Sequence, residues 1–281
     1  MRIGVIVPVR EPAPFLDEAL DSARGQSPPP DELAVVHDER GEGPAATRDE
    51  GLGRLGGCDW IALLDADDAW EPGKLAAQVA ALERHPEAVA CFGHAVAVGE
   101  DGTPTGERMP SPVAGAYPAK DLGPLLYESN LVPASSVLLR RDALEEAGGF
   151  AGPAPLASDW DLWLRLAARG GDFVCEPKAR IRYRRHEGGV TADVAAMAES
   201  MLKVHEAHES LVDEDTRVRV KSRDLVLLAR GRIRERRWDE AARALREADK
   251  LAPLSGREVA LRRLTRVPGL RRALGHRRPY R

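Results

Sequence analysis

The chain has 281 residues, of which 43% are hydrophobic and 31% charged, and its formal net charge is −4, a composition typical of a soluble globular protein. No segment approaches the roughly 18 consecutive apolar residues of a membrane-spanning helix, and Cys58, Cys91 and Cys175 are spaced too widely to predict a disulfide framework or a zinc site. The N-terminal segment resembles a first strand and not a signal peptide, so we expect a cytoplasmic protein.

The first half of the chain alternates strand-like and helix-like segments. We expect strands at residues 3–9, 33–38, 59–65 and 88–98, and helices at residues 14–26, 44–55 and 74–85. Strands this apolar are buried on both faces, and their alternation with helices implies a parallel sheet with crossover connections. Because ligands of such sheets bind beyond the carboxyl ends of the strands, polar residues at those ends are the candidate site.

The middle of the chain is rich in glycine and proline and predicts loops around shorter elements. The expected elements are a strand at 135–140, a helix at 141–148, a helix at 158–170 with Ser158 as its cap, and strands at 172–177 and 179–186.

From about residue 192 the pattern is helical only. Residues about 225–253 have the spacing of a single tetratricopeptide-like helical hairpin. The positions that match this spacing are Ala229, Ala241, Leu245, Ala248 and Pro253. One such hairpin cannot bury its own face, so we expect it to pack on the first domain or on a second subunit, the latter giving a homodimer. Residues 257–281 contain nine Arg and one Glu. This basic tail is either a solvated end or a peripheral contact with anionic lipid.

Three aspartates, Asp65, Asp67 and Asp68, stand where the third apolar segment stops. Like charges this close repel, so water, a metal ion or a protonated carboxyl must compensate. Capping the next helix would need only one of them. A divalent cation explains the cluster better, because Mg²⁺ takes one or two carboxylates and completes its shell with water and substrate phosphates.

Three other interpretations of local motifs fail. The "GLGRLG" segment at 51–56 has the G-x-G-x-x-G pattern, but it closes a helix and precedes a strand, the reverse of a dinucleotide site. A calcium loop would need Asp or Asn and then Gly where Ala69 and Trp70 stand. A haloacid-dehalogenase-like phosphatase would likewise need Thr or Val in place of Ala69.

The ordered motifs "IGVIVPVRE", "GPAATRDEG", "LLDADDAWEPGKLAAQ", "NLVPASSVLLRRDALEEAGGF", "SDWDLWLRLAARG" and "YRRH" resemble those of family-2 glycosyltransferases over residues 1–190. The resemblance implies the GT-A fold, an α/β domain with a mostly parallel, Rossmann-like mixed sheet flanked by helices, followed by a helical region at 191–281. It also implies inverting transfer of a sugar from a nucleoside-diphosphate sugar, with Mg²⁺ or Mn²⁺ bound.

The resemblance assigns the donor and metal residues. Asp65 and Asp67 occupy the family's Asp-x-Asp, which holds the metal against the diphosphate, and Asp68 could share that duty. Arg48 matches the family's Arg, although its neighbour Asp49 replaces the usual Asn. The positions that fall where the family binds base and ribose are Pro8, Arg10, Glu11 and Asp38. The segment "VVHDERG" departs from the family pattern, so the identity of the base stays open.

Asp159 matches the family's catalytic base, although Ser158 replaces the Glu that normally precedes it. Such a base removes the acceptor's proton as the acceptor attacks the anomeric carbon. The alternative is a charge that only stabilises the helix N-terminus. Asp161 is two residues further on and lies on another face of the helix.

Other residues of these motifs keep two interpretations. His186 resembles the position from which many GT-A enzymes reach the metal or diphosphate, or it is structural. Trp160 and Trp163 either both pack in the core or divide between the core and the acceptor cleft. Arg184 and Arg185 either meet phosphate or face solvent on an edge strand.

We therefore predict a metal-dependent inverting glycosyltransferase whose acceptor is unidentified and which has no nucleic-acid partner. One alternative is a catalytically degenerate GT-A domain that acts as a binding or scaffold module. Another is a sugar nucleotidylyltransferase, which would need a glycine-rich basic loop where "VREPAPFLDEAL" follows the first strand.

Overall fold

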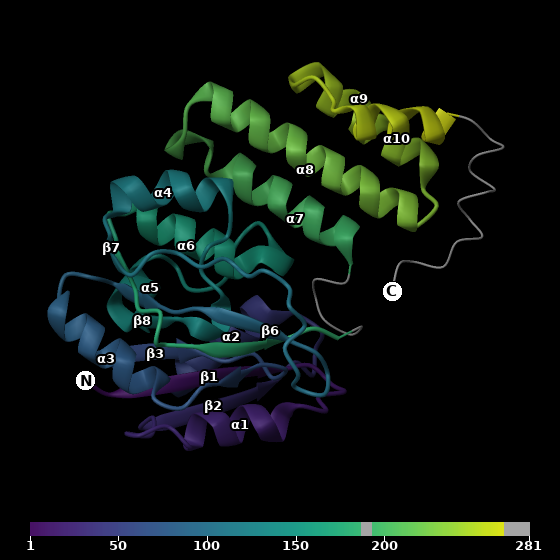
Figure 1. Cartoon of the computed structure of the whole chain (residues 1–281). Coiled ribbons are helices and arrows are strands. Elements are labelled where there is room, and N and C mark those ends of the chain that lie inside the picture. The colour runs from purple at the N-terminus through teal and green to yellow at the C-terminus, as the bar shows by residue number, and fades with distance from the viewer. Residues whose placement is uncertain (187–192, 267–281) are drawn as a thin grey trace. The chain divides into compact units, whose positions relative to one another are not determined.

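The computed structural model describes residues 1–186 and 193–266 and divides the chain into two compact units, Met1–Glu187 and Gly188–Arg281 (Figure 1). The predicted basic tail, residues 257–281, lies outside the described residues from position 267 onward.

The first unit contains the strands and six of the described helices. The strands are β1 (Ile3–Val9), β2 (Glu32–His37), β3 (Trp60–Leu63), β4 (Ala69–Trp70), β5 (Ala90–Phe92), β6 (Ala95–Val98), β7 (Gly115–Tyr117), β8 (Leu138–Arg140), β9 (Phe173–Cys175) and β10 (Ile181–Arg184). The α-helices are α1 (Leu16–Arg24), α2 (Pro44–Arg54), α3 (Lys74–Arg84), α4 (Ala119–Glu128), α5 (Arg141–Glu146) and α6 (Ser158–Ala168), and short 3₁₀ turns are η1 (Ala134–Ser136) and η2 (Pro155–Ala157).

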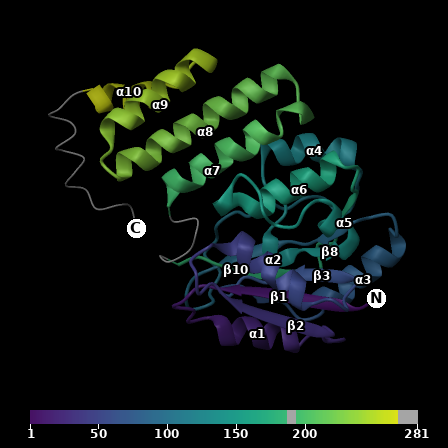
Figure 2. The same ribbon diagram turned by 180° about the vertical axis from the view of Figure 1, so that it is seen from behind.

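A seven-stranded mixed sheet forms the centre of this unit, in the order β2-β1-β3-β8-β5-β9-β7. β1 is parallel to β2 and β3, as the helical crossovers require, whereas β8 is antiparallel to both β3 and β5. Helix α1 lies on one side of the sheet and helices α4 and α6 lie on the other (Figures 1 and 2). The carboxyl ends of β1, β2 and β3 therefore share one edge.

Both faces of β1 are buried, as its apolar sequence predicts. Ile3, Val5, Val7 and Val9 join a core cluster with Ala19, Leu20 and Ala23 of α1. On the opposite face, Gly51 of α2 lies so close to Ile6 that an added Cβ would stand 2.5 Å from the Ile6 Cγ2. The "GLGRLG" motif thus closes a helix, as predicted, and its first glycine lets that helix approach the sheet.

The single strand predicted at 88–98 is two strands in two sheets. β5 belongs to the large sheet, and β6 belongs to a three-stranded sheet of order β4-β10-β6. The break falls at Gly93, where a Cβ would lie 1.7 Å from the carbonyl oxygen of Ala179, so only glycine permits this approach. The prediction of an edge strand at Arg184 is wrong, because β10 is the middle strand of this small sheet and brings residues 181–186 beside the acidic loop.

Helix α6 corrects one expectation, for Ser158, and decides between the two alternatives for Trp160 and Trp163. Ser158 is the first helical residue and Ala157 occupies the N-cap position, so Ser158 is not the cap. The indole N–H groups of Trp160 and Trp163 donate to the carbonyl oxygens of Leu126 (2.7 Å) and Val132 (3.1 Å), and both rings are buried. Both tryptophans therefore pack in the core, and neither lines an acceptor cleft.

The second unit is helical in its described part, with α7 (Val194–Ala207), α8 (Glu214–Arg234), α9 (Trp238–Leu251), α10 (Gly256–Arg266) and the 3₁₀ turn η4 (Glu209–Leu211). α8 and α9 form a hairpin whose buried cluster contains Ala229, Ala241, Leu245 and Ala248. Where α7 crosses α8, a Cβ on Gly231 would lie 2.6 Å from the backbone of Ala195. None of the described helices combines the length and apolar character needed to cross a membrane.

Candidate functional site

The acidic loop, Asp65 to Asp68, follows β3 directly and leads into β4. The backbone N–H of Asp68 donates to the carbonyl oxygen of Asp65 (3.1 Å), which closes a tight turn. The side chains of Asp65 and Asp67 are 30% and 35% exposed, whereas Asp68 is buried. The turn therefore sends two carboxylates outward and one into the protein.

Asp68 uses both of its carboxylate oxygens on protein donors. The Ser135 hydroxyl donates to Oδ2 (2.6 Å) and the backbone N–H of Arg184 donates to Oδ1 (3.0 Å). Burial, and then the charges of Asp67 and Asp65, hold the pKa of Asp68 well above its usual value. These contacts make Asp68 an anchor of the loop.

Asp67 faces His186, which lies just past the end of β10. The Nε2 of His186 and the Oδ2 of Asp67 are 2.9 Å apart, although 119 positions separate the two residues. Burial and the charge of Asp65 raise the pKa of Asp67, and the hydrogen bond from His186 opposes that rise. The negative charge of the loop is therefore only partly compensated by the protein.

The donor set can be tested against a divalent cation. Within residues 1–186 and 193–266, no three His, Cys, Asp or Glu side chains converge as a complete ligand set. Asp67 and His186 nevertheless form a carboxylate–imidazole pair beside a second carboxylate, Asp65. Mg²⁺ characteristically uses one or two carboxylates and takes its remaining ligands from water and phosphate. The pair fits a cation that binds together with a phosphorylated substrate.

Arg48 joins the acidic loop to helix α6. Its buried guanidinium donates from Nη2 to the Oδ1 of Asp65 (2.7 Å) and also interacts electrostatically with Asp159. Burial lowers the pKa of Arg48, but the carboxylates of Asp65, Asp159 and Asp67 together outweigh it and raise the pKa above its usual value. Within the described structure its Nε has no hydrogen-bond partner, which is an uncommon state for a buried donor.

Asp159 lies in the first turn of α6 and is half-buried. Asn130 donates from Nδ2 to its Oδ2 (3.3 Å). Burial raises the pKa of Asp159, against the opposing effect of Arg48. A carboxylate with a raised pKa is a stronger base. Asp161, by contrast, is buried and accepts from the Nε of Arg165 (2.8 Å), so its carboxylate is used in a buried ion pair.

The ends of β1 and β2 carry a second group of polar residues. Glu11 and His37 approach each other, with the Oε1 and Nδ1 atoms 3.4 Å apart, and both are exposed. Asp38 accepts the backbone N–H groups of Glu42 (2.8 Å) and Gly43 (2.9 Å), so it orders the loop that leads into α2. Pro8 is half-buried in β1 and Arg10 is exposed.

The structure thus places the predicted residues in two groups. Asp65, Asp67, Arg48, Asp159 and His186 interact with one another as a single charged cluster. The second group, at the ends of β1 and β2, comprises Pro8, Arg10, Glu11 and Asp38.

Sequence reasoning gave no role to Ser135 and Asn130, and neither of its two alternatives for Arg184 describes the buried contacts of that side chain. The first two lie in "NLVPASS", a motif noted in the sequence without any role for these side chains. A polar residue beside a predicted buried strand was the available signal for Ser135. Nothing in the local pattern identified its partner, which is 67 positions away.

Comparisons with known proteins identify similar sequences and folds. Residues 33–148 match the family described as glycosyl transferase family 2. The uncharacterized proteins Rv1520 of Mycobacterium tuberculosis and Mb1547 of Mycobacterium bovis are each 33% identical over 135 residues, which are 47% of this chain. The aligned region is 36% of those proteins, so the chain spans about a third of the length of the curated relatives it matches.

Solved structures share the fold over nearly the whole chain. S. aureus TarS residues 1–349, in complex with UDP-GlcNAc, superposes with a TM-score of 0.63 at 17% identity, covering 98% of this chain and 88% of that one. The mannosyltransferase PcManGT from Pyrobaculum calidifontis, in complex with GDP-Man and Mn²⁺, gives 0.57 at 17% identity, covering 98% and 83%. At this identity the likeness establishes the fold, and the predicted GT-A architecture with a helical C-terminal region is confirmed.

Proposed function

From the premise that the first unit of the chain belongs to glycosyl transferase family 2, we propose that it transfers a sugar, with inversion, from a nucleoside-diphosphate sugar to an acceptor. The observation that carries the proposal is the buried guanidinium of Arg48, which pairs with Asp65 and interacts with Asp159. One cation thereby joins the acidic loop, on the donor side, to the candidate base.

The acidic loop would receive the donor's diphosphate. Asp67 and His186 would hold a divalent cation there, with Asp65 beside them, and we assign no metal contact to Asp68 because protein donors occupy its oxygens. The cation would neutralise charge that develops on the leaving diphosphate. The free Nε of Arg48 is a further donor next to the same carboxylates.

Asp159 would act on the acceptor. Its carboxylate takes the proton of the acceptor hydroxyl while that oxygen bonds to the anomeric carbon and the bond from this carbon to the diphosphate oxygen breaks. Attack from the face opposite the leaving group inverts the configuration. Arg48 keeps Asp159 ionised by opposing the effect of burial on its pKa.

The exposed pair Glu11 and His37, together with Asp38, would meet the base and ribose. Related structures contain UDP-GlcNAc in one case and GDP-Man in another, so both uridine and guanosine donors belong in the test. The acceptor and any pairing of two copies through the helical unit stay predictions.

A catalytically degenerate GT-A domain is the second candidate. Ser158 favours it, because this residue stands where the resemblance predicts Glu, and it is buried. Asp159 is then the carboxylate at the start of α6 that interacts with Arg48. Whether Asp159 can act as a base decides between the transferase and the degenerate domain.

The proposal is tested by nucleotide release from UDP-, GDP- and dTDP-sugars with and without Mn²⁺. The expected result is release that needs Mn²⁺ and is lost in Asp67→Ala, while Asp21→Asn, an exposed acid of α1, behaves as wild type. Product analysis by NMR should give the inverted anomer. If no donor is turned over and no nucleoside diphosphate raises the melting temperature, the scaffold function holds instead.

A further inference from the structure

We infer that Arg184, buried under the acidic loop, is the positioning residue that holds Asp67 against His186 and thereby sets the affinity of the first unit for its divalent cation. The inference deepens the proposed function and rests on it. It assigns Arg184 a part other than the phosphate contact or the exposed edge predicted from the sequence.

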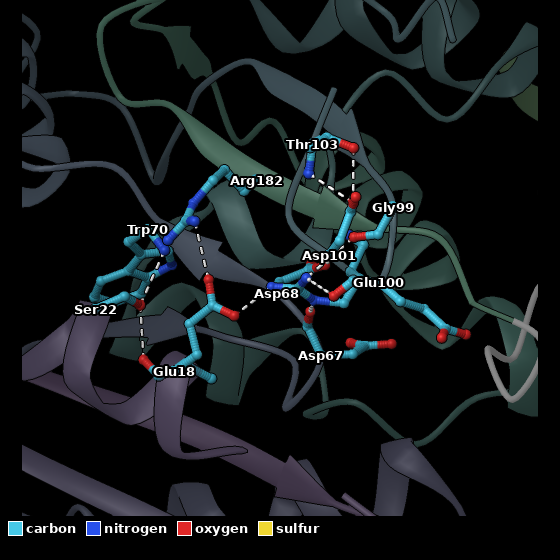
Figure 3. A network of polar contacts seen from close by, with 12 residues as sticks. Glu18, Ser22, Asp67, Asp68, Trp70, Gly99, Glu100, Asp101, Thr103 and Arg182 are labelled. Atoms are coloured by element: carbon cyan, nitrogen blue, oxygen red, sulfur yellow. Dashed lines mark hydrogen bonds and ion pairs between the residues drawn. The ribbon is translucent and has the colours of Figure 1, made fainter. Parts of the chain in front are cut away.

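Every nitrogen of the Arg184 guanidinium donates to a different segment. Nε donates to the carbonyl oxygen of Asp67 (2.9 Å), and Nη2 donates to the Oε2 of Glu18 on α1 (2.5 Å). Nη1 donates to the carbonyl oxygens of Gly99 (3.1 Å) and Glu100 (2.9 Å), just after β6. Figure 3 shows these acceptors, from α1, the acidic loop and the loop after β6, gathered around one point.

Because the guanidinium of Arg184 is buried, it needs protein partners for its donors and its charge. The side chain of Arg184 is only 2% exposed, and a buried charge is tolerated where its partners satisfy it. Glu18 supplies an ion pair, the three carbonyl oxygens supply the remaining acceptors, and the guanidinium also lies 4.4 Å from the centre of the Phe15 ring. Because its donors are used inside the protein, Arg184 is not placed to bind a phosphate.

Arg184 also contacts Asp68, and it shares a neighbour, Phe15, with His186. Its backbone N–H donates to the Oδ1 of Asp68 (3.0 Å), so both the side chain and the main chain of Arg184 bind the acidic loop. His186 follows two positions later, and its ring packs against the Phe15 ring in a T-shaped arrangement with a centroid distance of 5.6 Å. Phe15 therefore contacts both Arg184 and His186.

These contacts predict a specific effect on cation binding. The carbonyl that Arg184 holds and the carboxylate that faces His186 belong to the same residue, Asp67. If the carbonyl is released, the carboxylate shifts relative to the imidazole. Lysine at position 184 would keep the charge, but it cannot donate to Asp67, Glu100 and Glu18 at once from one planar group.

Arg182 provides a matched control. It lies on the same strand and pairs with the same Glu18 (2.9 Å) and also with Glu71 (3.8 Å), but its side chain is 34% exposed, and among the described residues no hydrogen bond from this side chain to the acidic loop is found (Figure 3). Replacing Arg182 thus removes the ion pairs to Glu18 and Glu71 and leaves the hydrogen bond from Arg184 to Asp67 intact.

The experiment measures the Kd for Mn²⁺ from the EPR signal of the free ion, with UDP and with GDP, for wild type, Arg184→Lys, Arg184→Gln and Arg182→Gln. We expect both Arg184 variants to raise the Kd by about 10- to 100-fold, as losing a residue that orients a metal ligand does. Arg182→Gln should stay within about twofold of wild type. Melting temperature is recorded for each variant.

The outcomes separate the inference from the proposed function. If wild type binds no Mn²⁺ with either nucleotide, both fall. If wild type binds Mn²⁺ and folded Arg184→Lys binds it equally well, with only a lower melting temperature, Arg184 is merely structural and the inference alone falls. Should both Arg184 variants fail to fold, Glu18→Gln decides, because it must weaken Mn²⁺ binding where Arg182→Gln does not.

Discussion

Arg48 and Asp65 form an ion pair of 2.7 Å in which the arginine side chain is only 6% exposed, and the same guanidinium acts on Asp159 from a distant part of the chain. Helix α2, the end of β3 and the first turn of α6 thus share one buried cation. Arg48 therefore links Asp65 of the acidic loop to the candidate base, Asp159.

Asp159→Asn should abolish transfer and leave donor binding unchanged. The amide cannot accept the acceptor's proton, but it preserves the shape of the side chain and its contact with Asn130. Calorimetric binding of the nucleoside diphosphate with Mn²⁺ and a transfer assay check the two halves of the prediction. A variant that transferred at the wild-type rate would remove Asp159 from the chemistry.

Asp49→Asn should lower kcat with little change in the KM for the donor. Its carboxylate accepts the backbone N–H groups of Phe150 (2.7 Å) and Ala151 (3.0 Å), which fix the segment leading into α6. An amide offers one acceptor oxygen, so its N–H₂ group would face a backbone donor. We expect kcat to fall by about tenfold or more, since small displacements of a catalytic group are costly.

Glu50→Gln is the control for that prediction. Glu50 is adjacent and pairs with Arg54 on the exposed side of α2, so its loss should leave kcat unchanged. An equal fall in both variants would mean that the α2 charge, and not the anchoring of the segment, is responsible.

Lys74→Met should stabilise the protein in a pH-dependent way. Lys74 is fully buried, donates to the Oε1 of Gln78 (2.8 Å) and lies 4.0 Å from the centre of the Trp70 ring. Burial lowers the pKa of Lys74 from its ordinary 10.5 to about 7. Below pH 7 the folded protein must hold a buried charge, so the variant should be more stable there, by about 3–5 kcal/mol.

The sign of the pH dependence follows from proton linkage. Between pH 7 and 10.5 the unfolded chain binds one more proton at this site than the folded chain, so wild-type stability rises with pH. The difference in the free energy of unfolding between Lys74→Met and wild type should therefore shrink by up to about 1.4 kcal/mol per pH unit. Urea unfolding across that range measures it, with the exposed Lys120→Met as control. Parallel curves for wild type and Lys74→Met would show that burial does not shift this amine.

The sequence alone was sufficient for the features set by local pattern. The apolar segments ending in Val9, His37 and Leu63 become parallel strands, so their carboxyl ends share the edge that carries the acidic loop. The glycines of "GLGRLG" were correctly separated from a dinucleotide site, because a helix precedes them and a strand follows. These conclusions needed only the order of elements and the rules of parallel sheets.

Features set by long-range partners were not predictable. Asp68 differs from Asp67 only in its environment, which Ser135 and the backbone of Arg184 create from 67 and 116 positions away. The split of the strand at Gly93 depends on the close approach of Ala179, and the burial of Trp160 depends on α4. No local pattern encodes which distant backbone a side chain will meet.

The most direct test of the whole account is the anomalous signal of Mn²⁺ in crystals grown with Mn²⁺ and the nucleoside diphosphate that stabilises the protein. The account predicts one peak within coordination distance of Asp67 and His186, in contact with the diphosphate, on the side of Arg48 that faces Asp65. A peak away from Asp67, or a diphosphate bound without any contact to the acidic loop, would contradict it.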